Sequence, residues 1–251
     1  MIPKTIHYCW FGRGEKPDSF QKCLESWKKH CPDYSIKEWN EETAVGYRGR
    51  FTEDALRKRK YAFAADAIRV EVLASEGGIY MDTDMLLVKP LDNLLNFDFF
   101  TGYEVPGRPA YGLFGAVKEH PLIIEMTRFY RDNRFNQFSP PVITHTFKDI
   151  VTPENLGEND RIFGSEYFYP LTYQDRDKDF RGFITEKTVA VHLWDHSWNS
   201  PRKEGLLQLV RNFNTVCIDR FFFDYPKSYF TRYSKEFARK IYHKLINKKV
   251  S

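Results

Sequence analysis

The chain has 251 residues, of which 17% are aromatic, and a formal net charge of +4 at pH 7. This length allows a substantial core, either as one α/β domain or as one domain with a helical appendage, and argues against two separate enzymes. Four cysteines, at positions 9, 23, 31 and 217, form no Cys-x-x-Cys pair, so we expect free thiols in a reducing compartment. The positive charge is concentrated in residues 226–251, which argues against a nucleic-acid-binding face spread over the fold.

Nowhere do about 18 apolar residues run together, and the amino terminus has no extended apolar segment. The sequence therefore predicts neither a secretion signal nor a membrane span. We expect a cytoplasmic protein, which its basic tail could hold at the inner face of the cytoplasmic membrane.

The first ninety residues alternate between short apolar segments and helical patterns. Strands are predicted at residues 4–10, 35–39 and 79–81, and helices at residues 19–30 and 52–75. Such alternation predicts an α/β fold with a mostly parallel sheet.

The later part of the chain is richer in loops. Here the pattern predicts strands at 98–104 and 188–193, a Gly/Pro-rich loop at 106–109, an apolar segment at 111–117 and a helix at 120–133. Residues 140–147 and 155–165 are interpreted as connections or acceptor-side structure.

Two carboxylates stand one residue apart in Asp82-Thr83-Asp84, directly after a short apolar segment. Side chains two apart in a strand point to the same side, so where the strand ends both acids can converge on one cation. Carboxylates suit Mg²⁺ or Mn²⁺, which usually keep open positions for substrate phosphates. Gly77-Gly78 permits a tight turn before this strand, and ligands of open α/β sheets collect at the carboxyl ends of strands. This context favours a metal site over an isolated pair of acids on a solvated turn.

Asp66 and Arg69 lie three residues apart and share a face of the predicted helix at 52–75. They could form a structural ion pair, or they could border the same pocket as the two acids. In the second case the carboxylate could hold ribose or sugar hydroxyls, and the guanidinium a phosphate or sugar oxygen.

His192 ends the strand predicted at 188–193 and is followed closely by Ser197 and Trp198. Alone, it would be interpreted as a packed core histidine. A metal held by two carboxylates and a pyrophosphate accepts another ligand, however, and neutral imidazole suits Mn²⁺. Ser197 and Trp198 could then donate hydrogen bonds to a departing phosphate.

As an ordered set, these motifs resemble glycosyltransferase family thirty-two, a group related to outer-chain mannosyltransferases and to the large glucosylating toxins, here of the bacterial capsular or exopolysaccharide type. The matching residues are Ile2-Pro3-Lys4-x-Ile6-His7-x-x-Trp10-Phe11-Gly12, Ser26-Trp27, Pro32-Asp33-Tyr34, Trp39-Asn40, Ala64-x-Asp66-x-x-Arg69, Gly77-Gly78-Ile79-Tyr80-x-Asp82-x-Asp84 and His192-x-x-x-x-Ser197-Trp198. They cover most of residues 2–90 and the segment 188–198.

The resemblance implies a GT-A fold, which is a single Rossmann-like nucleotide-sugar-binding domain, and transfer with retention of configuration. It implies Asp82, Asp84 and His192 as ligands of Mn²⁺ or Mg²⁺, and Arg69, Asp82 and Asp84 as the catalytic residues. The donor-binding residues that it implies are His7, Tyr8, Trp10 (against the base), Ala64, Asp66, Arg69, Gly78, Asp82 (also toward the ribose), Thr83, Ser197 and Trp198 (on the β-phosphate).

The segment 103–117 departs from the family pattern, in which an Asn is expected near residues 110–112. The mechanism implied is stabilisation of the leaving group by a metal and hydrogen-bond donors, and it needs no dedicated nucleophile. A double displacement would instead need a carboxylate beneath the sugar, for which Glu104 and Glu166 are the candidates.

Residues 1–225 are expected to form the GT-A domain, with the donor site mainly in 1–90 and 186–200 and the acceptor side in about 100–185. Residues 226–251 are expected to form a basic amphipathic helix, in which five apolar residues recur at helical spacing: Phe230, Tyr233, Phe237, Ile241 and Leu245. This helix either packs on the body or contacts an anionic membrane surface.

The sequence thus predicts a metal-dependent glycosyltransferase that moves a hexose or N-acetylhexosamine from a nucleotide sugar, with a UDP-sugar preferred over GDP-mannose. The expected acceptor is a glycan or lipid-linked glycan in capsule, exopolysaccharide or lipopolysaccharide assembly. Two alternatives are a nucleotide-sugar phosphohydrolase and a non-catalytic sugar- or nucleotide-binding module in which the two acids hold Ca²⁺.

Overall fold

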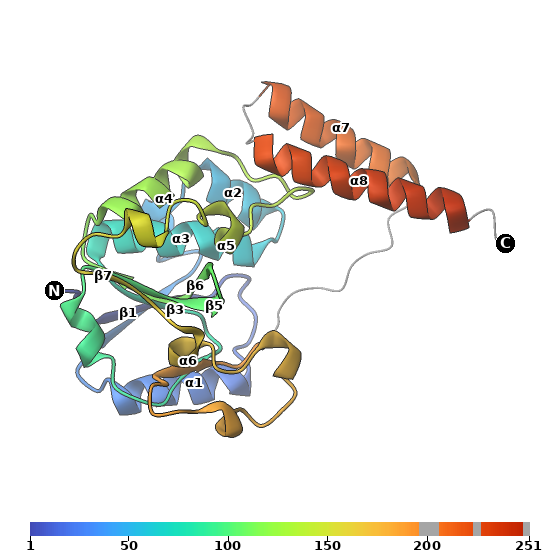
Figure 1. The fold of residues 1–251 in the computed structure, drawn as a ribbon. Helices are drawn as coiled ribbons and strands as arrows, with labels where there is room; N and C mark the ends of the chain where they lie inside the picture. The colour runs from blue at the N-terminus through green and yellow to red at the C-terminus, as the bar shows by residue number, and fades with distance from the viewer. Residues whose placement is uncertain (196–205, 223–226, 248–251) are drawn as a thin grey trace.

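The computed structural model describes residues 1–195, 206–222 and 227–247, and in them one sheet is covered by helices on both faces (Figure 1). Helices α2, α3, α4 and α5 cover one face, and α1 and α6 cover the other (Figure 1). The large sheet has the order β2-β1-β3-β6-β5-β7, and β4 pairs with β8 in a separate two-stranded sheet. This arrangement confirms the α/β fold class.

The strands of the large sheet are β1 (Thr5–Cys9), β2 (Ser35–Trp39), β3 (Gly78–Met81), β5 (Phe99–Val105), β6 (Arg108–Ala116) and β7 (Asp160–Phe163). The small sheet consists of β4 (Met85–Leu87) and β8 (Ala190–His192). In the large sheet only β6 is antiparallel to its neighbours. The sheet is therefore mixed and mostly parallel, as the sequence predicts.

The helices are α1 (Asp18–His30), α2 (Arg50–Arg57), α3 (Tyr61–Glu76), α4 (Pro121–Asp132), α5 (Ile143–Thr146), α6 (Ser165–Phe168), α7 (Leu206–Phe222) and α8 (Lys227–Asn247). Short 3₁₀ segments occupy Val45–Tyr47, Asp92–Asn96, Pro153–Asn155, Tyr173–Asp175 and Phe180–Phe183.

The single helix predicted at 52–75 is in fact two helices, α2 and α3. Helix α2 ends because Arg59 adopts a left-handed conformation with φ of 54°. Its N–H donates to the carbonyl of Leu56, and the N–H of Lys60 donates to that of Ala55. This pair of hydrogen bonds is a Schellman cap, which periodicity alone does not reveal because the capping residue is usually glycine.

Two further expectations are corrected in the loop-rich part. Residues 155–165, interpreted as a connection or acceptor-side structure with no strand, contain the strand β7, which pairs with β5 at the edge of the sheet. Its residues are mostly half-buried, so it lacks the apolar run or alternation that marks a strand in sequence. Strand β6 also begins at Arg108, inside the expected loop at 106–109.

Helix α3 passes directly into β3 through Gly77 and Gly78, whose φ angles are +68° and +107°. A Cβ on Gly77 would lie 2.7 Å from the backbone nitrogen of Lys118, so a larger residue is excluded by space as well as by conformation. The turn delivers β3 to the middle of the sheet, and the motif beginning at Asp82 follows it.

Helix α1 fixes the segment that follows the two acids. Its buried side carries Phe20, Cys23 and Trp27 at helical spacing. The indole N–H of Trp27 donates to the carbonyl of Met85 at 2.7 Å, and the Ser26 hydroxyl accepts from the N–H of Leu87 at 2.9 Å. Strand β4 is thereby held against α1.

The parallel strands β1, β2 and β3 end at one edge of the sheet. Trp10, Asn40 and Asp82 follow these strands, so they lie along that edge. It is the edge at which α/β folds bind ligands.

Candidate metal and donor site at the carboxyl edge of the sheet

Asp82 and Asp84 are the first and last residues of a tight turn between β3 and β4. The N–H of Asp82 donates to the carbonyl of Gly112 at 2.7 Å, and the N–H of Met85 donates back to the carbonyl of Asp82 at 3.0 Å. These two bonds fix the backbone on both sides of the motif. Thr83 between the acids is half-buried.

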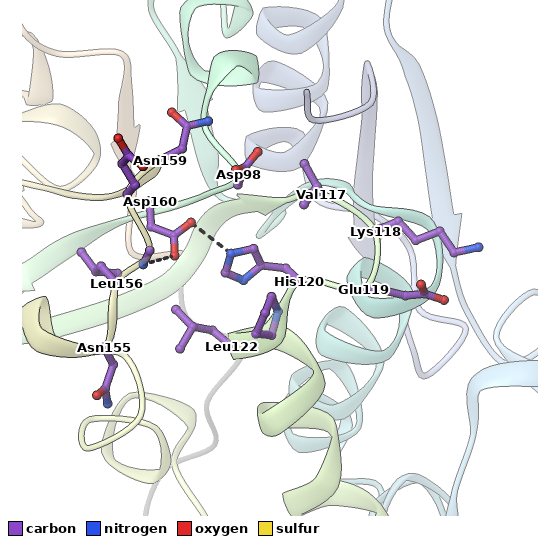
Figure 2. Close-up of a pocket in the computed structure, with 13 residues that line it drawn as sticks. Asp98, Val117, Lys118, Glu119, His120, Leu122, Asn155, Leu156, Asn159 and Asp160 are labelled. Atoms are coloured by element: carbon purple, nitrogen blue, oxygen red, sulfur yellow. Dashed lines mark hydrogen bonds and ion pairs between the residues drawn. The ribbon is translucent and has the colours of Figure 1, made fainter.

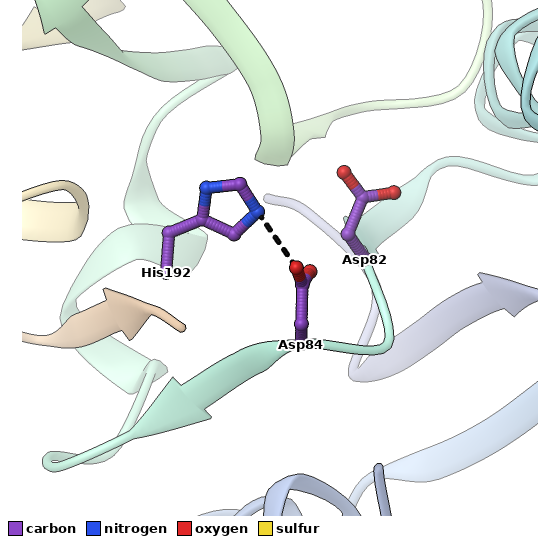
Figure 3. A group of neighbouring side chains, drawn as sticks. All are labelled: Asp82, Asp84 and His192. Carbon is purple, nitrogen blue, oxygen red and sulfur yellow. Dashed lines mark ion pairs between the residues drawn. The ribbon is translucent and has the colours of Figure 1, made fainter. Parts of the chain in front are cut away.

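His192 reaches Asp84 because β4 and β8 are antiparallel and pair Met85 with His192. The N–H of Leu193 donates to the carbonyl of Asp84, which continues this pairing. Nε2 of His192 lies 3.1 Å from Oδ2 of Asp84 (Figure 3), and the N–H of Asp195 donates to the same oxygen at 3.1 Å. A segment far along the chain therefore completes the motif.

Asp82, Asp84 and His192 have the chemistry and spacing of a divalent-cation site. One ligand atom from each lies within 4.8 Å of the other two (Figure 3). Two ligands about 2.1 Å from one ion, at right angles to each other, are about 3.0 Å apart. The 3.1 Å separation of Nε2 and Oδ2 matches that value. Two carboxylates and one imidazole suit Mg²⁺ or Mn²⁺.

The protonation states of these groups depend on one another. Burial alone would raise the pKa of Asp84, but the charge and hydrogen bond of His192 outweigh it and hold that pKa below its ordinary value. Burial and Asp84 raise the pKa of Asp82, against the opposing charge of Arg69. Burial would lower the pKa of His192, but Asp84 raises it above its ordinary value. The pairing of His192 with Asp84 thus shifts the pKa of each group toward its charged form.

Arg69 is buried behind Asp82, and protein atoms accept from all five of its N–H groups. Its two terminal nitrogens approach the Asp82 carboxylate at 3.1 and 3.4 Å. The remaining donors face Oδ1 of Asp66 at 3.1 Å, the carbonyl of Tyr111 at 2.8 Å and the carbonyl of Ala65 at 3.4 Å. In this geometry all the donors of Arg69 are used within the protein, and the residue positions the Asp82 carboxylate.

Asp66 is also buried, and its carboxylate pairs with Arg69. Burial raises its pKa to about 7, although the Arg69 charge opposes that shift. The two residues form the buried ion pair that was one of the two sequence interpretations.

Gly112 and Tyr169 belong to this site but were missed by the sequence analysis. A Cβ on Gly112 would lie 2.9 Å from Oδ2 of Asp82 and 3.2 Å from the Tyr169 hydroxyl. That hydroxyl accepts from the N–H groups of Gly112 and Leu113, both at 3.1 Å, and the ring meets His192 edge-on. The Asn expected near residues 110–112 is absent, and the glycine there allows the strand to approach Asp82. In the sequence, the absence of that Asn was the one available signal for a role of Gly112.

Trp10 lies at the same edge of the sheet, where its partly exposed indole stacks on Phe20 with ring centroids 6.0 Å apart. Its N–H donates to the carbonyl of Gly14. Tyr8 lies deeper, packed between Phe20 and Trp27, and its hydroxyl donates to Glu38 at 2.6 Å. Trp10 therefore keeps an accessible ring surface for a base, whereas the Tyr8 ring forms part of the core.

The structure places three further expected donor residues inside the protein, away from the two acids. His7 is fully buried: Nδ1 accepts from the Trp39 indole N–H at 3.1 Å, and Nε2 donates to the carbonyl of Gly77 at 2.9 Å. Gly78 begins β3 at the end away from Asp82, and a Cβ there would lie 2.8 Å from His7. Ala64 is fully buried in α3. All three residues are buried.

The remaining expected residues divide into two groups. Ser197 and Trp198 lie outside the described residues. Glu104 and Glu166, the candidates for a nucleophile, both have cationic partners: Glu104 pairs with Arg108 at 3.0 Å and Glu166 with Lys187 at 3.5 Å.

A hollow of about 850 Å³ lies elsewhere, where α4 begins and β7 starts (Figure 2). Its inner wall carries His120, whose Nε2 lies 3.0 Å from Oδ1 of Asp160. None of the predicted donor or metal residues lines it. We therefore place the candidate site at the carboxyl edge.

The fold and the site define an α/β domain with an acidic Asp-x-Asp motif at the carboxyl edge of its mixed, mostly parallel sheet. Residues 17–101 match the family model "Glycosyltransferase sugar-binding region containing DXD motif", and residues 118–221 match "Alpha 1,4-glycosyltransferase conserved region". The chain is thus similar to glycosyltransferases in two consecutive regions.

Curated relatives include three named transferases or synthases. Human alpha-1,4-N-acetylglucosaminyltransferase is 25% identical over 177 residues, which cover 66% of this chain and 51% of the relative. Mannosyl phosphorylinositol ceramide synthase CSH1 of Saccharomyces cerevisiae is 28% identical over 228 residues, which cover 84% of this chain and 58% of that relative. Human lactosylceramide 4-alpha-galactosyltransferase is 28% identical over 161 residues, which cover 56% of this chain and 44% of that relative. The chain spans about half the length of these relatives.

Among the described residues, no helix is both long enough and apolar enough to cross a membrane.

Proposed function

We propose that the chain is a metal-dependent, retaining glycosyltransferase that moves a hexose or N-acetylhexosamine from a nucleotide sugar to a glycan or lipid-linked glycan. The observation that carries this proposal is the convergence of Asp82, Asp84 and His192 at the carboxyl edge of the sheet. Carboxylates beside an imidazole can hold a cation that binds a diphosphate, and α/β sheets bind nucleotides at this edge.

The names of the relatives support the choice of substrates. They mention N-acetylglucosamine, galactose and mannose as sugars, and two of the three mention a ceramide lipid. A UDP-sugar is the first donor to test and GDP-mannose the second. A lipid-linked acceptor for a cell-surface polysaccharide or glycolipid is the first acceptor class.

A bound Mn²⁺ or Mg²⁺ would be held by Asp82, Asp84 and His192 and would neutralise charge on the diphosphate leaving group. The chain itself supplies the rest of the arrangement. Arg69 fixes the Asp82 carboxylate, and the partly exposed ring of Trp10 can stack on the base. Asp66 keeps Arg69 in place rather than touching the donor.

Retention fits a front-face reaction better than a double displacement. A double displacement needs a free carboxylate beneath the anomeric carbon, whereas Glu104 and Glu166 both have cationic partners. In a front-face reaction the acceptor hydroxyl attacks on the side from which the phosphate departs, and a phosphate oxygen takes its proton. The bond from the sugar to the phosphate breaks as the new glycosidic bond forms.

The test is a donor panel of UDP-glucose, UDP-galactose, UDP-N-acetylglucosamine and GDP-mannose, scored by release of nucleoside diphosphate with Mn²⁺. We expect release from one donor, stimulated by a glycolipid acceptor, and loss of at least about 100-fold in rate in Asp84→Asn. Asp177→Asn, at an exposed carboxylate, is the matched control.

Each alternative function has its own outcome in that assay. Donor cleavage that no acceptor stimulates would indicate a nucleotide-sugar phosphohydrolase. Donor binding without turnover of any donor would indicate a binding module. Equal rates for Asp84→Asn and the parent protein would contradict the assigned site.

A further inference from the structure

Helix α7 exposes a stripe of large apolar side chains. Six of the eleven exposed large apolar side chains among the described residues lie on α7 and α8, and one of the six is Tyr242 on α8. The five on α7 fall within about a third of the helix circumference at 100° per residue. We call them the α7 stripe: Leu207, Val210, Ile218, Phe221 and Phe222.

Apart from the Phe221 ring, which meets Phe230 of α8 edge-on with centroids 5.7 Å apart, the α7 stripe is separate from the contacts that hold the hairpin of α7 and α8 together and attach it to the body. Phe213 stacks on Phe237 of α8 with ring centroids 4.4 Å apart. Asp219 forms an ion pair with Arg134 of the body, and the Tyr229 carbonyl accepts from Ser139 at 3.1 Å. The docked sides of α7 are therefore occupied, and its apolar stripe faces elsewhere.

The hairpin is strongly basic as well as apolar. Its described residues include eight Lys and Arg residues against only Asp219 and Glu236. Both acids already have a cationic partner, Arg134 and Lys240 respectively. Lys235 on α8 is exposed and contributes to the surplus of positive charge. A second copy of this surface would be repelled, whereas an anionic one would be attracted.

The combination of exposed apolar side chains and surplus positive charge identifies the class of partner. Apolar side chains beside Lys and Arg on a helix are typical of segments that lie in the interface of a membrane containing anionic lipids. In Figure 1 the hairpin projects from the body on the side toward which β1 runs, which is the side of the candidate site. A membrane in contact with the hairpin would lie near the edge where an acceptor must enter.

We propose that the α7–α8 hairpin binds the surface of anionic membranes, with the α7 stripe among the lipid headgroups and the basic side chains against their phosphates. This proposal deepens the proposed function. It rests on that function only for the purpose of the membrane contact, which is the delivery of a lipid-linked acceptor. The binding itself requires neither donor nor turnover.

The test is co-sedimentation of the full-length chain with lipid vesicles, without donor or acceptor. We expect binding to vesicles of phosphatidylcholine mixed with phosphatidylglycerol, weaker binding to phosphatidylcholine alone, and release at high salt. The double variant L207S/F222S should weaken binding by about tenfold or more. V45S/I184S, which changes exposed apolar residues of the body, should bind like the parent chain.

A second pair of variants tests the charge. K235E/R239E should lower binding to the mixed vesicles about tenfold. K22E/K28E, which reverses two exposed charges on α1, should leave it unchanged. If circular dichroism shows that L207S/F222S does not fold, the charge variants K235E/R239E and K22E/K28E test the proposal instead.

Three outcomes would overturn the proposal: no binding to the mixed vesicles, equal binding by the parent chain and both hairpin variants, or equal losses in the body controls. Dimerisation that sedimentation velocity detects and L207S/F222S abolishes, without vesicle binding, would assign the stripe to self-association instead. Vesicle binding by a chain that turns over no donor would uphold this inference while the proposed function fails.

Discussion

His192 lies directly opposite Met85 in the antiparallel pair of β4 and β8, so its imidazole meets Asp84, the residue before Met85. The metal cluster is therefore a product of strand pairing between segments more than one hundred residues apart. The pairing is supported from outside, because α1 holds β4 through Trp27.

Replacing His192 should weaken metal binding more than it weakens the fold. We expect His192→Ala to raise the Mn²⁺ concentration needed for half-maximal donor cleavage by about tenfold or more, because one of three ligands is lost. Metal titration of the activity and of tryptophan fluorescence both measure this. His145→Ala, at an exposed histidine, is the control, and an unchanged Mn²⁺ requirement would remove His192 from the metal site.

Arg69→Lys should destabilise the protein by about 3 kcal/mol or more, because a lysine cannot satisfy Asp66, Asp82 and Tyr111 together. Chemical denaturation measures the change in the free energy of unfolding. The matched control is Arg131→Lys, whose partner Glu71 lies near the surface, and for which we expect a change of about 1 kcal/mol or less. Comparable losses in both variants would argue against a positioning role for Arg69.

Gly112→Ala should disturb the metal site while leaving the fold intact. The added Cβ would lie 2.9 Å from Oδ2 of Asp82, so that carboxylate must move away from its present position. We expect a fall in donor cleavage of about tenfold or more with little change in melting temperature. Gly182→Ala, where a Cβ meets nothing within 4 Å, is the control. Full activity in Gly112→Ala would show that the carboxylate tolerates the shift.

His7 should make the protein less stable in acid. Burial lowers the pKa of His7 to about 4 from 6.5, so between these values the unfolded chain binds a proton that the folded chain does not. The free energy of unfolding is then not reduced by His7 above about pH 6.5, and it falls by up to about 3 kcal/mol as the pH drops to about 4. His7→Gln should lack this part of the pH dependence when the free energy of unfolding is measured across that range. Parallel pH curves for His7→Gln and the parent would contradict the shift.

The sequence by itself determined the parts of the fold and site that depend on local pattern. Ser35–Trp39 is predicted as a strand because it stands between a turn and a polar break, and the segment before Asp82 because it is a short apolar run that follows two glycines. The Asp-x-Asp pair is visible because its two acids interrupt an apolar run. The Gly77-Gly78 turn is visible because glycine tolerates positive φ.

Only the tertiary structure decided which motif residues are buried in the core and which lie at the carboxyl edge of the sheet. His7 and Gly78 match a family motif as well as Asp82 does, yet they contact each other in the core. The sequence leaves Arg69 open between a structural ion pair and a phosphate or sugar contact, whereas in the structure all five of its N–H groups face protein acceptors. The physical reason is that a motif specifies residue types, whereas the direction of a side chain and its remaining hydrogen-bonding capacity depend on contacts between segments distant in sequence.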